Sequence, residues 1–366
     1  MTEPHAFREQ FPVFENGAYL NAGTTGPVPR RAADAAHVRV ELETSQGRGG
    51  RPYFEGLIAL VGDLRAAYAR VLGCRAREVA LTGSTTDGVN TVLAGLRLGP
   101  DDEVLTSDEE HPGLLAPLGR ARRRHGIKVR VVPFSQVADE VSGSTRLIAC
   151  SHVSWVSGRV ADVAALTATG VPLLLDAAQA LGAVPVDVRS LGCDFYAASG
   201  QKWLCGPEGS GCLFVREDRL EELDVPWPWY ASLSDPEQAL EFVPAAGARR
   251  LDHGFPAGVR CAWALASLQV LDEAGWEWIH ERAALLAARL AEQLAGHGLD
   301  VWPRGRSTLV AWKVADAQAE VQRLALAGFI VRSIPATGLV RASVGAWSSE
   351  AELESLVRLA ADTAGR

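Results

Sequence analysis

The chain of 366 residues lacks the signals that would place it in a membrane, on nucleic acid or around a metal ion. No apolar run approaches the roughly 20 residues needed to span a bilayer, and residues 1–5 lack the basic and apolar regions of a signal peptide. The six cysteines include no Cys-x-x-Cys pair, which argues against a zinc site and a disulfide framework. The longest basic run is Arg122-Arg123-Arg124, in a chain of net charge −8. We therefore expect a cytoplasmic protein with no nucleic-acid partner, no membrane partner and no metal.

Short apolar runs that alternate with helical stretches fill residues 78–216. Continuous apolar runs are typical of strands covered on both faces, and their alternation with helices indicates a mainly parallel sheet. The seven expected strands are residues 79–82, 103–107, 129–132, 146–151, 172–176, 194–198 and 211–215. We therefore predict an α/β fold with a mainly parallel, seven-stranded sheet.

The sequence pattern changes beyond residue 225, where a long link containing proline and glycine precedes further expected helices and strands. We expect helices at residues 260–274, 276–297, 318–327 and 349–364, and strands at residues 307–314, 330–333 and 339–344. The sequence thus predicts a large domain over residues 16–245. A smaller α+β domain is expected to consist of residues 1–15 and 246–366.

Two strands end in residues that suit a pyridoxal phosphate (PLP) site. Asp176 closes one apolar run, and Lys202 follows the next run within Ser-Gly-Gln-Lys. Proteins attach PLP through a lysine Schiff base and tune it with an acid at the ring nitrogen. Alternatively, Lys202 is a paired structural residue, and Asp176 is a helix N-cap with Gln179 as its capping partner. Together the three residues favour the cofactor, with Gln179 as donor to its phenolic oxygen.

A turn of small polar residues offers a place for the phosphate of the cofactor. Residues 83–90 read Gly-Ser-Thr-Thr-Asp-Gly-Val-Asn, follow an expected strand and open a helix. The N–H groups and positive dipole end of a helix N-terminus attract phosphate. Ser199 and Gln201 are further candidate donors from another strand. His111, at the end of a third strand, either stacks on the cofactor ring and relays protons or is a solvated loop histidine.

Two arginines and a tryptophan are candidates for substrate binding. Arg341 lies inside an otherwise apolar strand, and Arg332 lies near the end of the preceding strand. A guanidinium suits bidentate capture of a substrate carboxylate, and an ion pair with a nearby acid is the alternative for each arginine. Trp155 and His152 lie just past the strand containing Cys150, at the same edge of the sheet. We expect Trp155 to shape the substrate pocket.

These motifs resemble the class V aminotransferase family, which includes cysteine desulfurases and selenocysteine lyases. The resemblance runs in family order over nearly the whole chain. It rests on Tyr19-Leu-Asn-Ala-Gly23, Ser84-Thr-Thr-Asp-Gly-Val-Asn90, Glu110-His111, Asp176-Ala-Ala-Gln179, Ser199-Gly-Gln-Lys202 and Arg341-Ala-Ser343. It implies the fold type I of PLP-dependent transferases, pyridoxal 5'-phosphate as cofactor, and an amino-acid substrate. It also implies a homodimer with active sites near the subunit interface.

The same resemblance gives each candidate residue a role. It implies that the cofactor is linked to Lys202, with its pyridine nitrogen at Asp176 and its phenolic oxygen at Gln179. Residues implied to bind the phosphate are Thr85, Thr86, Ser199 and Gln201. His111 would stack on the ring, and Arg341 would bind the substrate carboxylate.

Three departures from the family pattern narrow the expected reaction. Cysteine desulfurases carry a nucleophilic cysteine just before the strand that bears the substrate arginine, but residues 332–338 are short and contain none. Gln201 replaces the usual histidine before the lysine, so it can donate to phosphate but carries no charge. Trp155 replaces an asparagine found in many members, so the substrate contacts there are expected to differ.

The segments Glu-His-Pro-Gly, Ser-His-Val-Ser-Trp and Lys-Trp-Leu-Cys-Gly-Pro look most like the L-cysteine/cystine C–S lyases of this family. These lyases β-eliminate without a cysteine nucleophile. The leading prediction is therefore a C–S lyase. Transamination and an α-epimerisation like that of the isopenicillin N epimerase branch remain open, as does a noncatalytic PLP-binding protein.

Overall fold

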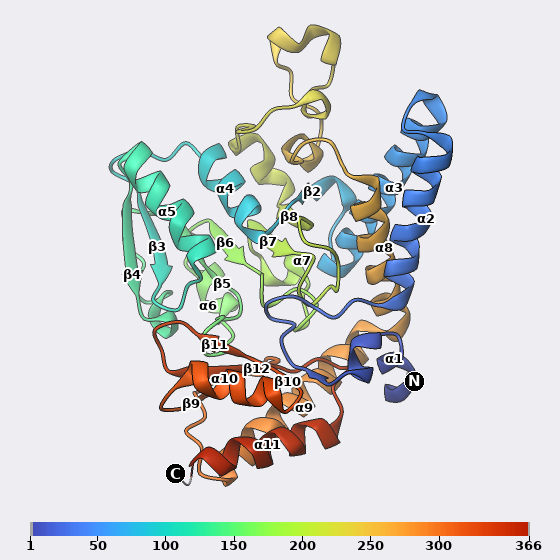
Figure 1. Ribbon diagram of the computed structural model, residues 1–366. Helices are drawn as coiled ribbons and strands as arrows, with labels where there is room; N and C mark the ends of the chain where they lie inside the picture. Colours follow the sequence, from blue (N-terminus) through green and yellow to red (C-terminus); the bar gives the residue numbers. More distant parts are fainter. Residues whose placement is uncertain (1–2, 365–366) are drawn as a thin grey trace.

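A seven-stranded sheet forms the centre of the computed structural model, which describes residues 3–364 (Figure 1). The strands lie in the order β2-β8-β7-β6-β5-β3-β4, and only the contacts of β8 with β2 and β7 are antiparallel. Each boundary lies within one residue of the expected one. The strands are β2 (Val79–Thr82), β3 (Glu103–Ser107), β4 (Lys128–Val132), β5 (Thr145–Ser151), β6 (Leu173–Asp176), β7 (Phe195–Ser199) and β8 (Gly211–Val215). The mainly parallel sheet is confirmed.

Helices cover both faces of this sheet, which explains its continuous apolar runs. Along β6, Leu174 packs into a core with α4 and α5, whereas Leu173 and Leu175 pack into a second core with α3 and α8 on the opposite face. The helices around the sheet are α2 (Arg30–Gln46), α3 (Gly50–Leu72), α4 (Thr85–Gly95), α5 (Pro112–His125), α6 (Val163–Ala168), α7 (Val188–Leu191) and α8 (Gly258–Ala274).

A smaller antiparallel sheet with its own core lies beside the ends of the central strands (Figure 1). Its strand order is β11-β12-β9, and it packs with the helices that follow α8. These elements are α9 (Trp276–Gly296), β9 (Leu309–Lys313), α10 (Ala317–Leu326), β11 (Arg332–Ile334), β12 (Leu339–Ser343) and α11 (Glu350–Ala364). The short helix α1 (Pro4–Arg8) precedes the first strand. The division of the chain at residues 16 and 245 stays a prediction.

The expectation of one strand over residues 330–333 is wrong. Ile330 belongs to β10 (Phe329–Ile330), which pairs in parallel with β1 (Ala18–Tyr19), whereas Arg332 begins β11 and pairs with β12. The backbone changes partner at Val331. An apolar run does not reveal this change, because the partner strand β1 lies more than 300 residues away in the sequence.

The segment between β8 and α8 contains only short 3-10 turns, and part of it projects beyond the sheet (Figure 1). Within residues 3–364, no helix combines the length and the apolarity needed to cross a membrane.

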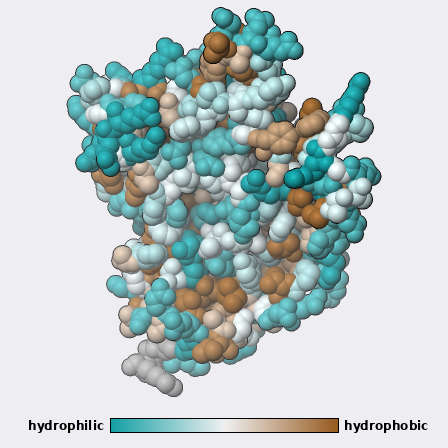
Figure 2. Space-filling view, turned by 45° about the horizontal axis from the view of Figure 1, so that its top comes forward, coloured by the Kyte–Doolittle hydropathy of each residue, from teal (hydrophilic) through white to brown (hydrophobic). Residues whose placement is uncertain are grey.

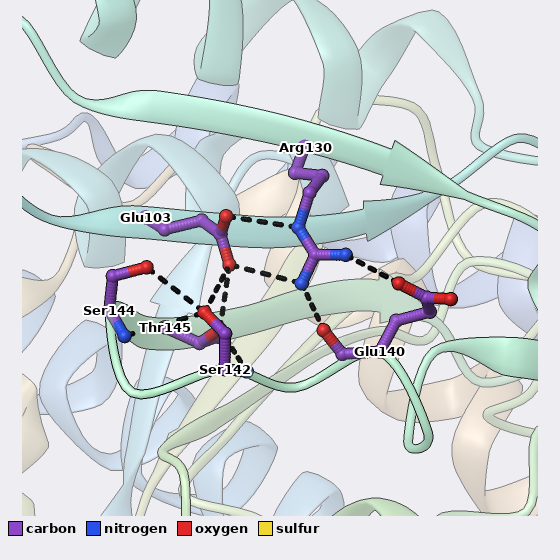
Figure 3. A network of polar contacts seen from close by, with 6 residues as sticks. All are labelled: Glu103, Arg130, Glu140, Ser142, Ser144 and Thr145. Atoms are coloured by element: carbon purple, nitrogen blue, oxygen red, sulfur yellow. Dashed lines mark hydrogen bonds and ion pairs between the residues drawn. The ribbon is translucent and has the colours of Figure 1, made fainter.

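A network of ion pairs and hydrogen bonds joins β3, β4 and β5 near their N-terminal ends (Figure 3). Arg130 on β4 donates from Nε to Glu103 on β3 over 2.9 Å and pairs with Glu140 over 2.7 Å. The hydroxyl of Thr145, at the start of β5, donates to Glu103 over 2.7 Å. Three strands are thus joined at the end of the sheet opposite to their carboxyl ends.

Candidate active site

The carboxyl ends of the central strands carry most of the predicted site residues. In open α/β sheets this edge is where ligands bind. His111 follows β3, Trp155 follows β5, Asp176 ends β6, and Lys202 follows β7. The smaller sheet adds Arg332 on β11 and Arg341 on β12, directly opposite each other in the strand register.

Asp176 is a buried acid and not a helix cap. Its Oδ1 accepts a hydrogen bond from the Ala178 N–H over 2.9 Å, but no helix begins between Asp176 and Val188. Burial raises the pKa of Asp176, opposed by this hydrogen bond and by the charge of Lys202. Gln179 likewise caps no helix: its amide donates to the Gly23 carbonyl over 2.7 Å and accepts from Trp203 Nε1 over 3.1 Å.

Lys202 lies in a turn that packs tightly against the N-terminal segment. The Gly26 N–H donates to the Gln201 carbonyl over 2.7 Å, and a Cβ on Gly26 would lie 2.0 Å from the Lys202 carbonyl oxygen. Burial lowers the pKa of Lys202 to about 8, helped by Arg341 and Arg332 and opposed by Asp176. The amine is therefore far easier to deprotonate than an exposed lysine.

The turn before α4 has the features of a phosphate cradle. Ser84 caps the helix by accepting from the Asp87 N–H over 3.1 Å. Ser199 Oγ accepts from the Thr85 N–H over 3.0 Å and lies 2.8 Å from Thr85 Oγ1, so the ends of β7 and β2 meet there. A helix N-terminus with two hydroxyl groups suits an anion.

The remaining phosphate candidates lie on either side of that cradle. Gln201 Oε1 is buried without a hydrogen-bond partner in the part of the chain that the structure describes. Thr86 Oγ1 faces the start of α5, where a Cβ on Gly113 would lie 2.5 Å away. Both assignments to phosphate stay predictions.

His111 is half-buried and caps α5, which sets its tautomer. Nδ1 accepts from the Gly113 N–H over 2.9 Å, so the ring proton of the neutral form lies on Nε2. Burial lowers the pKa of His111 to about 4, and the charges of Lys202, Arg332 and Arg341 act in the same direction. The ring also meets Trp155 edge-on at 4.8 Å. The histidine is therefore neutral near pH 7 and is not a solvated loop residue.

Arg341 is fully buried, and two of its three nitrogens lack a partner among residues 3–364. Nη1 donates to the Trp155 carbonyl, whereas Nε and Nη2 have no hydrogen-bond partner in the described part of the chain. Arg332 donates to Thr24 Oγ1 over 3.1 Å and lies over the Trp155 ring at 5.9 Å. Neither arginine forms an ion pair with a described acid, so the ion-pair alternative is wrong for both.

Gly23, quoted only as part of a motif, proves to lie at the centre of these groups. A Cβ there would lie 2.8 Å from Arg341 Nη2, 2.8 Å from Ser343 Oγ and 2.9 Å from Gln179 Oε1. Only glycine leaves this space open. The tight packing depends on the pairing of the N-terminal segment with β12, which no local pattern reveals.

Glu110 is a second residue that sequence reasoning left without a role. Its carboxylate accepts from Ser107 Oγ over 2.5 Å and from both the N–H and Oγ of Ser151, at 3.0 and 2.5 Å. Burial raises its pKa to about 7 against the effect of these hydrogen bonds. It joins the ends of β3 and β5 next to His111. The only sequence signal was an acid next to a strand-end histidine.

The residues present fit pyridoxal phosphate. A lysine with a lowered pKa, a buried acid at a neighbouring strand end and a helix N-terminus with hydroxyl groups are the donor set that this cofactor requires. The two unpartnered nitrogens of Arg341 match a carboxylate of an amino acid.

The sequence matches the pattern of the family described as aminotransferase class-V over residues 18–356. A probable cysteine desulfurase of Methanothermobacter thermautotrophicus is 31% identical over 230 residues, which cover 59% of this chain and 57% of that protein. The isopenicillin N epimerase of Streptomyces clavuligerus is 32% identical over 278 residues, which cover 69% of this chain and 68% of that protein.

A similar solved structure is the complex of the cystine C–S lyase C-DES with its reaction product cysteine persulfide. Its TM-score is 0.91 at 27% sequence identity, and the match covers 97% of this chain and 100% of that chain. Fold, cofactor site and relatives agree: the chain belongs to the aminotransferase class-V family and is a PLP-dependent enzyme of fold type I.

Proposed function

We propose that the enzyme is a C–S lyase that β-eliminates a cystine- or cysteine-like amino acid without an enzyme-bound persulfide. The observation that carries this proposal is the tight connection between β11 and β12. Only residues 335–338 separate the two strands, and Thr337 closes the turn by hydrogen bonds to Ile334. No cysteine lies in this connection, where desulfurases are expected to carry one.

The six cysteines support the same conclusion. Five are buried, and burial raises the pKa of every one of the six thiols, that of the partly exposed Cys74 to about 12. The thiolate is the reactive form of cysteine, so none of these thiols is suited to attack a substrate sulfur at neutral pH.

We assign the proton transfer to Lys202. When bound, PLP supplies an electron sink for the negative charge that develops at the substrate α-carbon. Lys202 would hold the cofactor, and its neutral amine would take the α-proton of the bound substrate. Asp176 would keep the ring nitrogen protonated through a charge-assisted hydrogen bond. Its burial strengthens that bond by excluding water.

Residues on the opposite side of the site, Arg341, Arg332 and His111, would orient the substrate. Arg341 binds the α-carboxylate through Nε and Nη2, because Nη1 is held by the Trp155 carbonyl. Arg332 adds a second positive charge beside the Trp155 ring. Neutral His111 lies against the same indole, where its ring would stack on the cofactor. After the β-thiol group leaves, the remaining fragment hydrolyses to pyruvate and ammonia.

α-Epimerisation is the second candidate, because the Streptomyces clavuligerus isopenicillin N epimerase is among the similar proteins. Transamination and PLP binding without catalysis are further alternatives. β-Elimination, epimerisation and transamination all begin with loss of the α-proton, and they differ in the fate of the resulting carbanion.

A substrate panel separates these reactions. The purified holoenzyme is incubated with L-cystine, L-cysteine and other amino acids, each with and without a keto acid. The lyase proposal predicts pyruvate together with sulfide or persulfide, independent of the keto acid. Amine exchange that requires a keto acid, or loss of chirality without pyruvate, would contradict it.

We also propose that the enzyme acts as a cytoplasmic homodimer. A groove of about 940 Å³ extends from α3 to Gly83 and Asp87 beside the phosphate cradle. Large hydrophobic residues at its rim are exposed, namely Phe54, Ile58, Tyr230 and Phe255. Figure 2 shows patches of hydrophobic surface on the right side of the molecule. A second copy on this face would explain the exposure, and six free cysteines suit a reducing compartment.

A further inference from the structure

A tight hairpin after β5 connects the central sheet with the substrate-binding wall. This hairpin, residues 154–159, is closed by the Ser154 N–H, which donates to the Arg159 carbonyl over 2.8 Å, and by the bridge between Val153 and Val160. Trp155 lies at its start. We call this segment the Trp155 hairpin.

The Trp155 hairpin contacts three of the residues assigned to the reaction. The Trp155 carbonyl accepts from Arg341 Nη1, and the Trp155 ring lies edge-on to His111 at 4.8 Å and beneath Arg332 at 5.9 Å. The carbonyl is the sole hydrogen-bond partner of the Arg341 side chain among the described residues. The direction in which Arg341 presents Nε and Nη2 therefore depends on where this hairpin lies.

Glu109, in the loop after β3, forms hydrogen bonds and an ion pair with the Trp155 hairpin. Its Oε2 accepts from the hydroxyl groups of Ser154 and Ser157, both fully buried, and its Oε1 lies 3.5 Å from Arg159 Nη1. Only 15% of the Glu109 side chain is exposed. Hydrogen bonds to an ionised acceptor are roughly twice as strong as neutral ones.

The two serines pass this restraint on to the backbone of the hairpin. Ser154 Oγ accepts from the N–H groups of Val156 and Ser157 over 3.2 and 3.1 Å, and Ser157 Oγ accepts from the Arg159 N–H over 3.1 Å. One carboxylate thus holds both hydroxyl groups that accept from the hairpin backbone. Without it, two buried hydroxyl groups lose their acceptor, which favours a different hairpin conformation.

We propose that Glu109 is a positioning residue for recognition of the substrate carboxylate. It fixes the Trp155 hairpin, the hairpin fixes Arg341, and Arg341 binds the carboxylate. Glu109 itself contacts Ser154, Ser157 and Arg159 of the hairpin and has no proposed contact with substrate or cofactor. The proposal rests on the role proposed above for Arg341, and it adds a residue from the loop after β3 to those that set the specificity of the site.

The test compares two amines that differ in the carboxylate. Binding of glycine and of methylamine to the holoenzyme is titrated by the change in visible absorbance of the cofactor. In Glu109→Ala we expect the Kd of glycine to rise about tenfold, because Arg341 loses its fixed orientation. The Kd of methylamine stays unchanged, because methylamine has no carboxylate for Arg341 to bind. Glu109→Gln, whose amide oxygen still accepts from both serines, should retain most of the affinity for glycine.

Two variants calibrate this comparison. Arg341→Ala should weaken glycine binding and spare methylamine binding. Glu103→Gln disrupts the network at the opposite end of the sheet (Figure 3) and should lower thermal stability without changing the ratio of the two Kd values. Because no turnover is measured, failure of the lyase assay leaves the comparison intact.

Several outcomes would overturn the proposal. One is a Glu109→Ala protein that binds both amines like the wild type, and another is equal weakening of both, which indicates general damage. A changed ratio in Glu103→Gln would show that the ratio reports stability and would also overturn it. If Arg341→Ala does not discriminate, the role of Arg341 is wrong, and the positioning proposal falls with it. If Glu109→Ala fails to fold, Ser157→Ala removes one of the two hydroxyl contacts and is judged by the same criteria.

Discussion

At the scale of single residues, the cost of burial indicates function. A buried guanidinium with two unpaired nitrogens is unfavourable, because each lost hydrogen bond to a charged group costs roughly 1.5–3 kcal/mol. Arg341 bears this cost on Nε and Nη2, and the proposed binding of a substrate carboxylate would remove it. Burial also brings the pKa of Lys202 down to about 8, which suits the proposed role of its amine as a base near neutral pH.

Replacement of Arg341 should affect binding more than chemistry. In Arg341→Lys the charge remains but the bidentate hydrogen bond to the substrate carboxylate is lost. We therefore expect the KM for the amino-acid substrate to rise about a hundredfold and kcat to fall far less. Steady-state kinetics on the preferred substrate measure both. An unchanged KM would show that the carboxylate binds elsewhere.

The lowered pKa of Lys202 predicts how the apoenzyme takes up PLP. Only the neutral amine attacks the aldehyde, and its fraction increases with pH until the pKa is passed. The rate of uptake, followed by visible absorbance, should therefore rise about tenfold per pH unit below about pH 8 and level off above it. A rate that still rises steeply at pH 10 would indicate an ordinary lysine.

At the scale of elements, the sequence predicts what depends on local pattern. Buried parallel strands are continuous apolar runs, so all seven strands of the central sheet could be placed, and Asp176 and Lys202 follow from their positions at strand ends. Contacts set by distant partners could not be predicted. The division between β10 and β11 depends on the pairing of β10 with β1. The hydrogen bonds of Glu109 with residues 154–159 join two loops that no sequence periodicity connects.

The network at the start of the strands yields a prediction on stability. Burial alone would raise the pKa of Glu103, but hydrogen bonds from Arg130, Thr145 and Ser142 lower it below its ordinary value. The carboxylate therefore stabilises the fold above that ordinary pKa, near 4.5, and this contribution is lost as the pH falls through the folded-state pKa.

Accordingly, Glu103→Gln should lower the free energy of unfolding by about 2 kcal/mol at pH 7. The difference from the wild type should shrink as the pH falls below 4.5. Denaturant unfolding at a series of pH values measures this difference, and a difference independent of pH would show that the charge of Glu103 is not responsible.

At the scale of the whole molecule, exposed hydrophobic residues along the groove beside the phosphate cradle predict a second copy. Ile58 is 71% exposed and lines this groove. Light scattering should give a particle of twice the 39.0 kDa chain mass. Ile58→Glu should shift it towards the monomer, because a charge would then be buried in the interface.

Leu326→Glu is the matched control, since Leu326 is 92% exposed at the end of α10 and does not line the groove. It should leave the mass unchanged. A wild type that is monomeric at every concentration would contradict the dimer.

The most direct test of the proposed reaction is the amount of pyruvate formed from L-cystine by the holoenzyme without any keto acid. β-Elimination predicts that pyruvate and ammonia appear in amounts equal to the L-cystine consumed, and that Lys202→Ala forms neither. Consumption of L-cystine that yields no pyruvate, whether through loss of chirality or only after a keto acid is added, would contradict the assignment of this enzyme as a C–S lyase.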